Sequence, residues 1–301
     1  MKRIPKQIVV PWILALLVSM SGGCADVTHL IIDRQPKGDD EIGITYYIGG
    51  AGPIGNVGSF DVPQGLRDAG YEGSVEVFTW QSWTHAGDQI NLTRNREKAA
   101  ELADRIHRYR RDHPIQPINL VALSAGTGIA VFALEYLPED IGINQVCFLS
   151  CSLSSRYDLT RALKRINGNL YVLYSPHDRV LNTLVWYTGT IDRSTASDGI
   201  AGLEGFYIPS PTRMDTLAQY QKVRNIPHRL EFTLVAYDGG HTDATSRSFV
   251  RRYLAPALLG NDKSLLGPHP EQRYEPFPVR IPAFHSSAQP APAGRSDFPG
   301  T

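Results

Sequence analysis

A serine near the middle of the chain stands where a nucleophile could act. Ser124 directly follows the apolar run Ile118–Leu123 and has small residues two places before and after it, Ala122 and Gly126. This spacing is typical of a nucleophile elbow, a sharp turn between a strand and a helix that lifts the hydroxyl clear of the sheet. Because a serine hydroxyl is a weak nucleophile at neutral pH, the pattern requires a base nearby.

Candidates for the base and its orienting acid follow two later strands of the expected sheet. His241 ends an Asp-Gly-Gly-His sequence, and Asp178 lies just past the apolar run 169–174. We expect His241 to accept the serine proton and Asp178 to hold and stabilise the resulting imidazolium. Asp178 could instead serve only as the cap of the next helix. Asp238 is the rival acid, but its place at a strand edge favours a turn.

Two backbone amides are candidates for the oxyanion hole. Ala125 follows the serine at the start of a predicted helix, where unpaired N–H groups and the helix dipole favour an anion. Ala51 lies in the glycine-rich turn 49–52, which has no bulky side chain and lets an N–H point inward. Trp80 and Trp83 follow another expected strand and are candidates to line the pocket.

Metal and disulfide chemistry find little support in the sequence. Two His/Asp pairs lack a third ligand at a sensible spacing: His85 with Asp88 and His241 with Asp243. Cys147 and Cys151 are four places apart in an expected strand, which puts their Cα atoms about 13 Å apart. A disulfide needs less than about 7 Å. We therefore expect two buried free thiols, no metal and no cofactor.

Strands and helices alternate through the body of the chain, which favours a mostly parallel central sheet with helices on both faces. In such sheets the active site lies at the carboxyl ends of the strands, where all three candidate side chains fall. The expected strands are 42–48, 74–80, 118–123, 143–150, 169–174 and 230–237. The expected helices are 91–113, 125–137, 156–166 and 245–259.

With these residues in place, the chain resembles the α/β-hydrolase superfamily, which includes serine esterases and lipases, over about residues 42–259. The resemblance rests on the elbow, on the chain order Ser124, Asp178, His241, and on the position of all three at strand ends. The chain departs from the family pattern where Ala122 replaces the usual first glycine of the elbow. It departs again where glycines 49–50 replace the usual His-Gly.

The resemblance implies a cofactor-free hydrolase that acts through an acyl-enzyme, most simply on a small-molecule carboxylic ester. Two alternatives remain open. An acyltransferase would use the same triad, and an inactive hydrolase-like protein could bind partners at a surface. The 51-residue segment 179–229 is the best-placed insertion to cap the pocket.

Composition is compatible with such an enzyme and excludes several other classes. Of the 301 residues, 20% are charged and 42% are hydrophobic, and this hydrophobic fraction is enough to bury a core. A collagen-like repeat, a disulfide-rich miniprotein and a wholly disordered chain are excluded. The 30 basic and 30 acidic side chains cancel, so no global field would gather nucleic acid.

The first 24 residues are typical of an export signal. Lys2 begins a basic start, and the apolar run 8–18 is too short for the roughly 20 residues of a membrane-spanning helix. Small residues then precede Cys24, as in a bacterial lipoprotein signal, in which the cysteine is acylated. Cleavage without lipid, after Gly23 or Ala25, is the alternative. We expect a protein exported to the cell envelope or periplasm, with a lipid on Cys24 as a route to the membrane surface.

These features divide the chain into a signal (1–24), a lead-in (25–41), a hydrolase-like domain (42–260) and a tail (261–301). The tail carries eight prolines and no apolar period. Because proline removes backbone donors and fixes φ, we expect the tail to be extended or disordered.

Overall fold

A computed structural model describes residues 38–52, 56–81, 88, 90–185, 188–210 and 212–267. It confirms the predicted α/β class, because the strands form one six-stranded, all-parallel sheet in the order β2-β1-β3-β4-β5-β6. The strands are β1 (Asp39–Ile48), β2 (Gly73–Phe78), β3 (Ile118–Leu123), β4 (Gln145–Leu149), β5 (Leu170–Tyr174) and β6 (Val223–Pro227).

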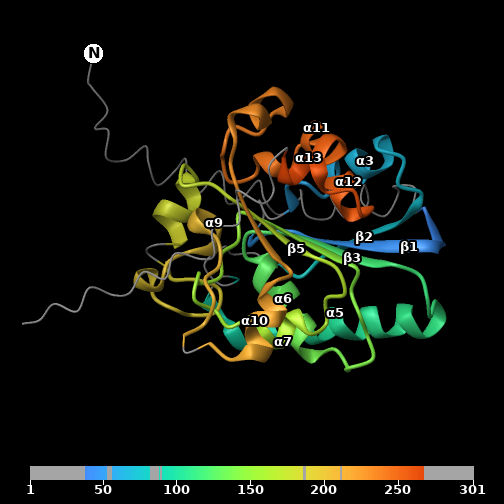
Figure 1. The fold of residues 1–301 in the computed structure, drawn as a ribbon, viewed down its shortest axis with the longest axis horizontal. Helices are drawn as coiled ribbons and strands as arrows, with labels where there is room; N and C mark the ends of the chain where they lie inside the picture. The colour runs from blue at the N-terminus through green and yellow to red at the C-terminus, as the bar shows by residue number, and fades with distance from the viewer. Residues whose placement is uncertain are drawn as a thin grey trace, which may run out of the picture.

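Helices cover both faces of the sheet (Figure 1). One face carries α5 (Leu92–Asp112), α6 (Gly126–Tyr136), α7 (Thr160–Leu163) and α10 (Met214–Tyr220). The other carries α3 (Asp61–Asp68), α11 (Arg247–Phe249), α12 (Ala255–Leu258) and α13 (Lys263–Leu266). The longest described helix, α5, is capped by Asn91, whose side chain accepts a hydrogen bond from the Arg94 amide at 3.0 Å.

The two-sided burial explains why all residues of β3 except Asn119 are apolar. Successive side chains of a strand point to opposite faces. Leu120 and Ala122 pack into the core under α5 and α6, while Val121 and Leu123 pack into the core on the opposite face. With both faces covered, neither set of alternate positions faces solvent, and Asn119, the one polar residue of the strand, is itself buried.

The strand order reverses direction between β1 and β3. The chain passes from β1 to β2 on one side and returns to β3 on the other side of β1. In open parallel sheets such a switch point leaves a crevice at the carboxyl ends of the two strands, and ligands bind there. Ile48 is paired with Ala122. The glycine turn after β1 and the serine turn after β3 therefore emerge side by side.

The prediction of a strand at 230–237 is wrong. Residues Leu230–Val235 form a short 3-10 helix, and the sixth strand is β6, seven residues earlier. Within 230–237 only Phe232 and Tyr237 are buried, while Leu230 and Leu234 are 83% and 85% exposed. The sequence gives no clear strand signal for β6, because it is a half-buried edge strand that contains an arginine and an asparagine. It also ends on Pro227, which an edge strand tolerates.

Two predicted helices are shorter or less regular than expected. Within 156–166 only the four residues of α7 are α-helical. The segment 245–259 is a series of short turns, with a π-helical stretch at Val250–Leu254 between α11 and α12. Pro256 has no N–H, so the regular i to i−4 bonding of an α-helix cannot run through it.

The domain boundaries also shift at both ends. β1 begins at Asp39 rather than 42, and residues 261–267 belong to the body rather than to an extended tail. Leu265 of α13 is buried, and its carbonyl accepts a hydrogen bond from Arg229 at 2.6 Å. The predicted signal, Cys24 and residues 268–301 lie outside the described residues. Within the described part, no helix is both long and apolar enough to cross a bilayer.

The predicted insertion 179–229 divides into two parts. Its second half supplies α10 and β6, which belong to the helical layer and the sheet. Its first half crosses the carboxyl ends of β4 and β5, where α9 (Ala201–Glu204) lies (Figure 1). Backbone hydrogen bonds from Ile191 to Ser152 and from Gly202 to Cys151 hold it there.

The contribution of α13 to the stability of the fold can be measured with a pair of leucine variants. We expect Leu265→Ala to lower the free energy of unfolding by about 2–5 kcal/mol, because it opens a cavity in a closed core. Leu259 is 55% exposed, so Leu259→Ala should change the free energy of unfolding by less than about 0.5 kcal/mol. Urea unfolding of both variants makes the comparison, and equal midpoints would contradict the packing of α13.

Candidate active site

The turn at Ser124 has the strained backbone that the elbow pattern predicts. Ser124 has φ 53°, in the left-handed region that residues other than glycine rarely adopt. Its amide donates to the Leu149 carbonyl at 2.9 Å, and its carbonyl accepts from the Thr127 amide at 3.0 Å and from Thr127 Oγ1 at 2.6 Å. These bonds tie the turn to β4 and to the first turn of α6. Ser124 is buried to 8% exposure at the carboxyl end of β3.

Backbone contact between the elbow and the turn after β1 is very close. A Cβ placed on Gly126 would lie 2.3 Å from the Gly49 carbonyl oxygen and 2.5 Å from that of Ile48. A Cβ placed on Gly50 would lie 3.2 Å from Ser124 Cβ and 3.7 Å from Ser124 Oγ. The glycine turn therefore borders the serine hydroxyl, and Gly126 is required for that approach.

Asp178 and His241, 63 residues apart in the chain, are joined by a hydrogen bond. His241 Nδ1 lies 2.8 Å from Asp178 Oδ2, and the aspartate is fully buried. Asp178 Oδ1 also accepts from the amides of Val180 and Leu181, both at 3.0 Å. Asp178 thus caps the helical turn that follows it and holds the histidine, so the two roles considered for it coexist on its two oxygens.

The loop that carries His241 is itself organised by a carboxylate. Asp243 Oδ2 accepts from the amides of Asp238 and Gly240, at 3.1 and 2.8 Å. Gly239 has φ 91°, and a Cβ there would lie 2.7 Å from Ser175 Oγ. Asp238, the rival acid, is exposed and makes no bond to His241. Asp238 lies in a turn, as expected, but not at a strand edge, because residues 230–235 form a 3-10 helix. For the same reason His241 does not directly follow a strand, and its predicted strand-end position is wrong.

Ser124 and Asp178 follow strands that are two places apart in the sheet, at the same edge. Neighbouring strands are about 4.8 Å apart, so these strand ends are about 10 Å apart. Within the described residues, no hydrogen bond joins Ser124 Oγ to His241. The structure thus brings Asp178 and His241 into direct contact and puts Ser124 at the same end of the sheet.

The two proposed oxyanion donors flank the serine from neighbouring elements. Ala125 is the N-cap of α6 and is fully buried, so its N–H lies at the positive end of the helix dipole. Ala51 lies in the turn after β1, directly after the glycine whose Cα faces Ser124. Both amides adjoin the elbow.

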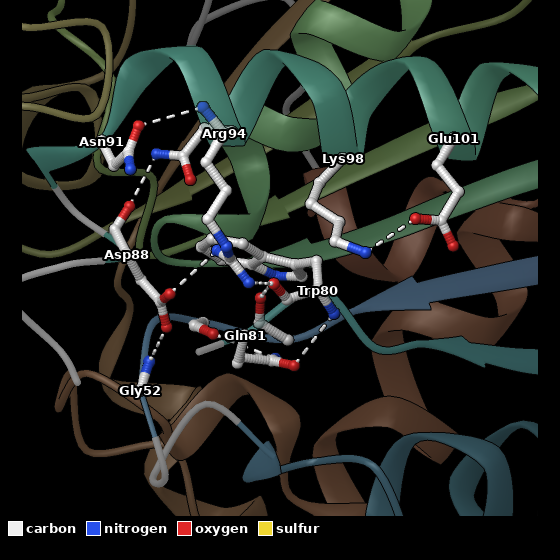
Figure 2. Close-up of polar contacts among 11 residues, drawn as sticks. Gly52, Trp80, Gln81, Asp88, Asn91, Arg94, Lys98 and Glu101 are labelled. Carbon is white, nitrogen blue, oxygen red and sulfur yellow. Dashed lines mark hydrogen bonds and ion pairs between the residues drawn. The ribbon is translucent and has the colours of Figure 1, made fainter. Parts of the chain in front are cut away.

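A polar cluster next to this turn was missed by sequence reasoning (Figure 2). Trp80, a candidate for the pocket wall, is buried in the core, and its indole Nε1 donates to the Gly49 carbonyl at 2.8 Å. Gln81 Nε2 donates to the Gly50 carbonyl at 3.0 Å. Buried Asp88, considered above as half of a metal pair, accepts from the Gly52 amide at 2.8 Å. Trp83 and His85 lie outside the described residues.

Cys147, Cys151 and Tyr237 are nucleophilic groups too, but they are buried and poorly suited to catalysis. Cys147 and Cys151 are buried free thiols, and burial raises the pKa of Cys151 to about 12, so a thiolate does not form at neutral pH. Burial, reinforced by the Asp178 and Asp243 carboxylates, raises the pKa of Tyr237. No cluster of three or more metal-ligating side chains occurs among the residues that the structure describes.

Comparison with known proteins adds no identification. No protein-family model matches this sequence, and no curated protein matches it significantly.

The close approach at Gly126 predicts that alanine is tolerated less well at position 126 than at position 128 of the same helix, α6. Gly126→Ala puts a methyl group 2.3 and 2.5 Å from two backbone carbonyl oxygens, whereas Gly128→Ala puts one 2.5 Å from the side chain of buried Ile191, which can shift more easily than backbone. Since both changes gain the same helix propensity, we expect Gly126→Ala to be the more destabilising by about 1–3 kcal/mol. Chemical denaturation measures this difference, and equal stability of the two variants would show that the two turns are not in contact.

Proposed function

We propose that this protein is a serine hydrolase that cleaves carboxylic esters through an acyl-enzyme, with Ser124, His241 and Asp178 as its catalytic residues. The observation that carries the proposal is the 2.8 Å bond between His241 Nδ1 and the buried Asp178 carboxylate, at the sheet edge where Ser124 sits in a strained turn. A carboxylate that fixes Nδ1 leaves Nε2 as the proton acceptor.

The reaction follows from the chemistry of these groups. Ser124 Oγ attacks the ester carbonyl carbon while its proton passes to His241 Nε2, and Asp178 stabilises the imidazolium. The Ala51 and Ala125 amides donate to the tetrahedral oxyanion. The C–O bond to the alcohol then breaks and the alcohol takes the proton from His241. Water, activated by His241, hydrolyses the acyl-enzyme in the same way and releases the acid.

Among the described residues no hydrogen bond joins Ser124 Oγ to His241, and this does not oppose the role proposed for them. Catalytic hydrogen bonds are often long or absent without substrate and shorten in the Michaelis complex. The strand order supports the assignment to the α/β-hydrolase superfamily, because Ser124 and the glycine turn flank the switch point. The segment 188–205, across the ends of β4 and β5, is our candidate for the cap that encloses the substrate.

Export is a separate part of the proposal and rests on residues 1–24 alone. A basic start, a short apolar run and small residues before Cys24 favour secretion to the cell envelope, with a lipid on Cys24 as the anchor. The substrate would then be an ester met outside the cytoplasm.

The nucleophile can be identified with a fluorophosphonate probe, because the phosphorus is attacked only by an activated serine. We expect the purified protein to be labelled and Ser124→Ala to abolish labelling. Ser150→Ala is the matched control, because Ser150 is also buried at a strand end with positive φ, 48°. Labelling that persists in Ser124→Ala would refute the assignment of the nucleophile. No labelling or ester turnover by the unmodified protein would favour an inactive binding protein.

The acid can be identified by comparing two aspartates. We expect Asp178→Asn to lower kcat/KM for a 4-nitrophenyl ester on the order of 10³- to 10⁴-fold, because an amide cannot stabilise the imidazolium and favours the wrong tautomer. Asp238→Asn should stay close to the unmodified protein. A larger loss in Asp238→Asn than in Asp178→Asn would reverse the assignment.

A further inference from the structure

The turn after β1 is held by side chains from the loop after β2. Gln81 Nε2 donates to the Gly50 carbonyl at 3.0 Å, and Trp80 Nε1 donates to the Gly49 carbonyl at 2.8 Å (Figure 2). Gln81 Oε1 accepts from the Trp80 amide at 3.1 Å, which fixes the side-chain amide with its NH₂ toward Gly50. Two successive carbonyls of a flexible turn are thus assigned to two fixed donors.

The cluster is closed by an ion pair between partly exposed Arg94 and buried Asp88. Arg94 Nη1 lies 3.1 Å from Asp88 Oδ1, and Arg94 Nη2 donates to the Trp80 carbonyl at 2.6 Å. Asp88 Oδ2 in turn accepts from the Gly52 amide at 2.8 Å. The loop after β2, the start of α5 and the turn after β1 are therefore tied together. The Gly52 N–H is already used and is not free for a substrate.

The direction of the Gly50 carbonyl determines the direction of the next amide. In a trans peptide the C=O and the following N–H point in opposite directions. β2 and β3 lie on opposite sides of β1 in the sheet. Because Gln81 follows β2 and donates to the Gly50 carbonyl, the Ala51 N–H is expected to be directed away from Gln81, and β3 with Ser124 lies on the other side of β1 from β2. Gln81 thereby orients the peptide without touching the reacting atoms.

A peptide that follows glycine is easily reversed. Gly50 has no Cβ and can adopt backbone angles closed to other residues, so rotation of the Gly50–Ala51 peptide meets little steric resistance. In the reversed state the Gly50 carbonyl, rather than the Ala51 N–H, would face the developing oxyanion. The site would then lose a donor and gain a repulsive dipole.

We propose that Gln81 is a positioning residue for the oxyanion hole, which keeps the Ala51 N–H directed at the reaction centre by holding the Gly50 carbonyl. The inference rests on the proposed serine hydrolase function. It adds that the rate of acylation depends on a donor outside the site, supported by Trp80, Asp88 and Arg94.

Three substitutions at Gln81 separate the donor from the mere presence of a side chain. Gln81→Leu removes donor and acceptor, Gln81→Glu keeps the acceptor for the Trp80 amide but removes the donor, and Gln81→Lys keeps a donor. Gln221→Glu is the matched control for Gln81→Glu. It introduces the same negative charge at an exposed position on another element. Hydrolysis of 4-nitrophenyl butyrate gives kcat and KM. A trifluoromethyl ketone, whose adduct with Ser124 carries an oxyanion, reports on the hole itself.

We expect kcat to fall on the order of 10- to 100-fold in the Leu and Glu variants, less than when an oxyanion donor is itself removed, with KM unchanged. The inhibition constant of the ketone should rise by the same factor. Gln81→Lys should keep most of the activity, and the melting temperatures should match that of Gln221→Glu.

Two negative outcomes have different meanings. If the unmodified protein turns over the ester in a Ser124-dependent way but the Leu and Glu variants match it, the positioning role is wrong and the hydrolase function stands. A Lys variant as slow as the Leu variant would also overturn the role of the donor. If the unmodified protein neither turns over the ester nor forms the ketone adduct, the hydrolase proposal itself fails.

Discussion

The contact between the turn after β1 and the turn after β3 is the constraint on which the candidate site depends. Carbonyls of Ile48 and Gly49 lie where a Cβ of residue 126 would be, so only glycine allows the two turns to meet. The register of the sheet, with Ile48 beside Ala122, brings them to that position. A strained serine, a helix N-terminus and a glycine turn with orientable amides are thus gathered at one switch point.

The positions of Asp178 and His241 depend on hydrogen bonds to a buried carboxylate rather than on close backbone packing. A fully buried carboxylate is costly unless its oxygens are satisfied, and Asp178 meets this condition with two amides and one imidazole. The same bonds begin the following helical turn and fix the ring of His241. Asp243 plays the corresponding part for the loop of His241, and Asp88 for the turn after β1. Three loops at one edge of the sheet therefore each depend on a carboxylate that accepts backbone amides.

Some strands of the sheet can be predicted from the sequence and others cannot. The strand 118–123 and the turn at Ser124 could be located because a strand buried on both faces is mostly apolar, and a sharp turn needs small neighbours. The edge strand β6 could not, since one open edge and partial burial remove the apolar signal. Phe232 and its neighbours alternate like a strand, yet Leu230 and Leu234 face solvent. Short-range pattern alone cannot tell which alternate positions will find a core.

The sequence by itself determined the α/β class and the candidates Ser124, Asp178 and His241, because hydrophobic period and turn composition are local properties of the chain. Only the tertiary structure decided which carboxylate meets His241, and that Trp80 and Gln81 bind the two glycine carbonyls. Those partners are 31 residues or more from the groups they bind. Such pairings depend on strand order and register, which place distant segments together and leave no periodic trace in the sequence.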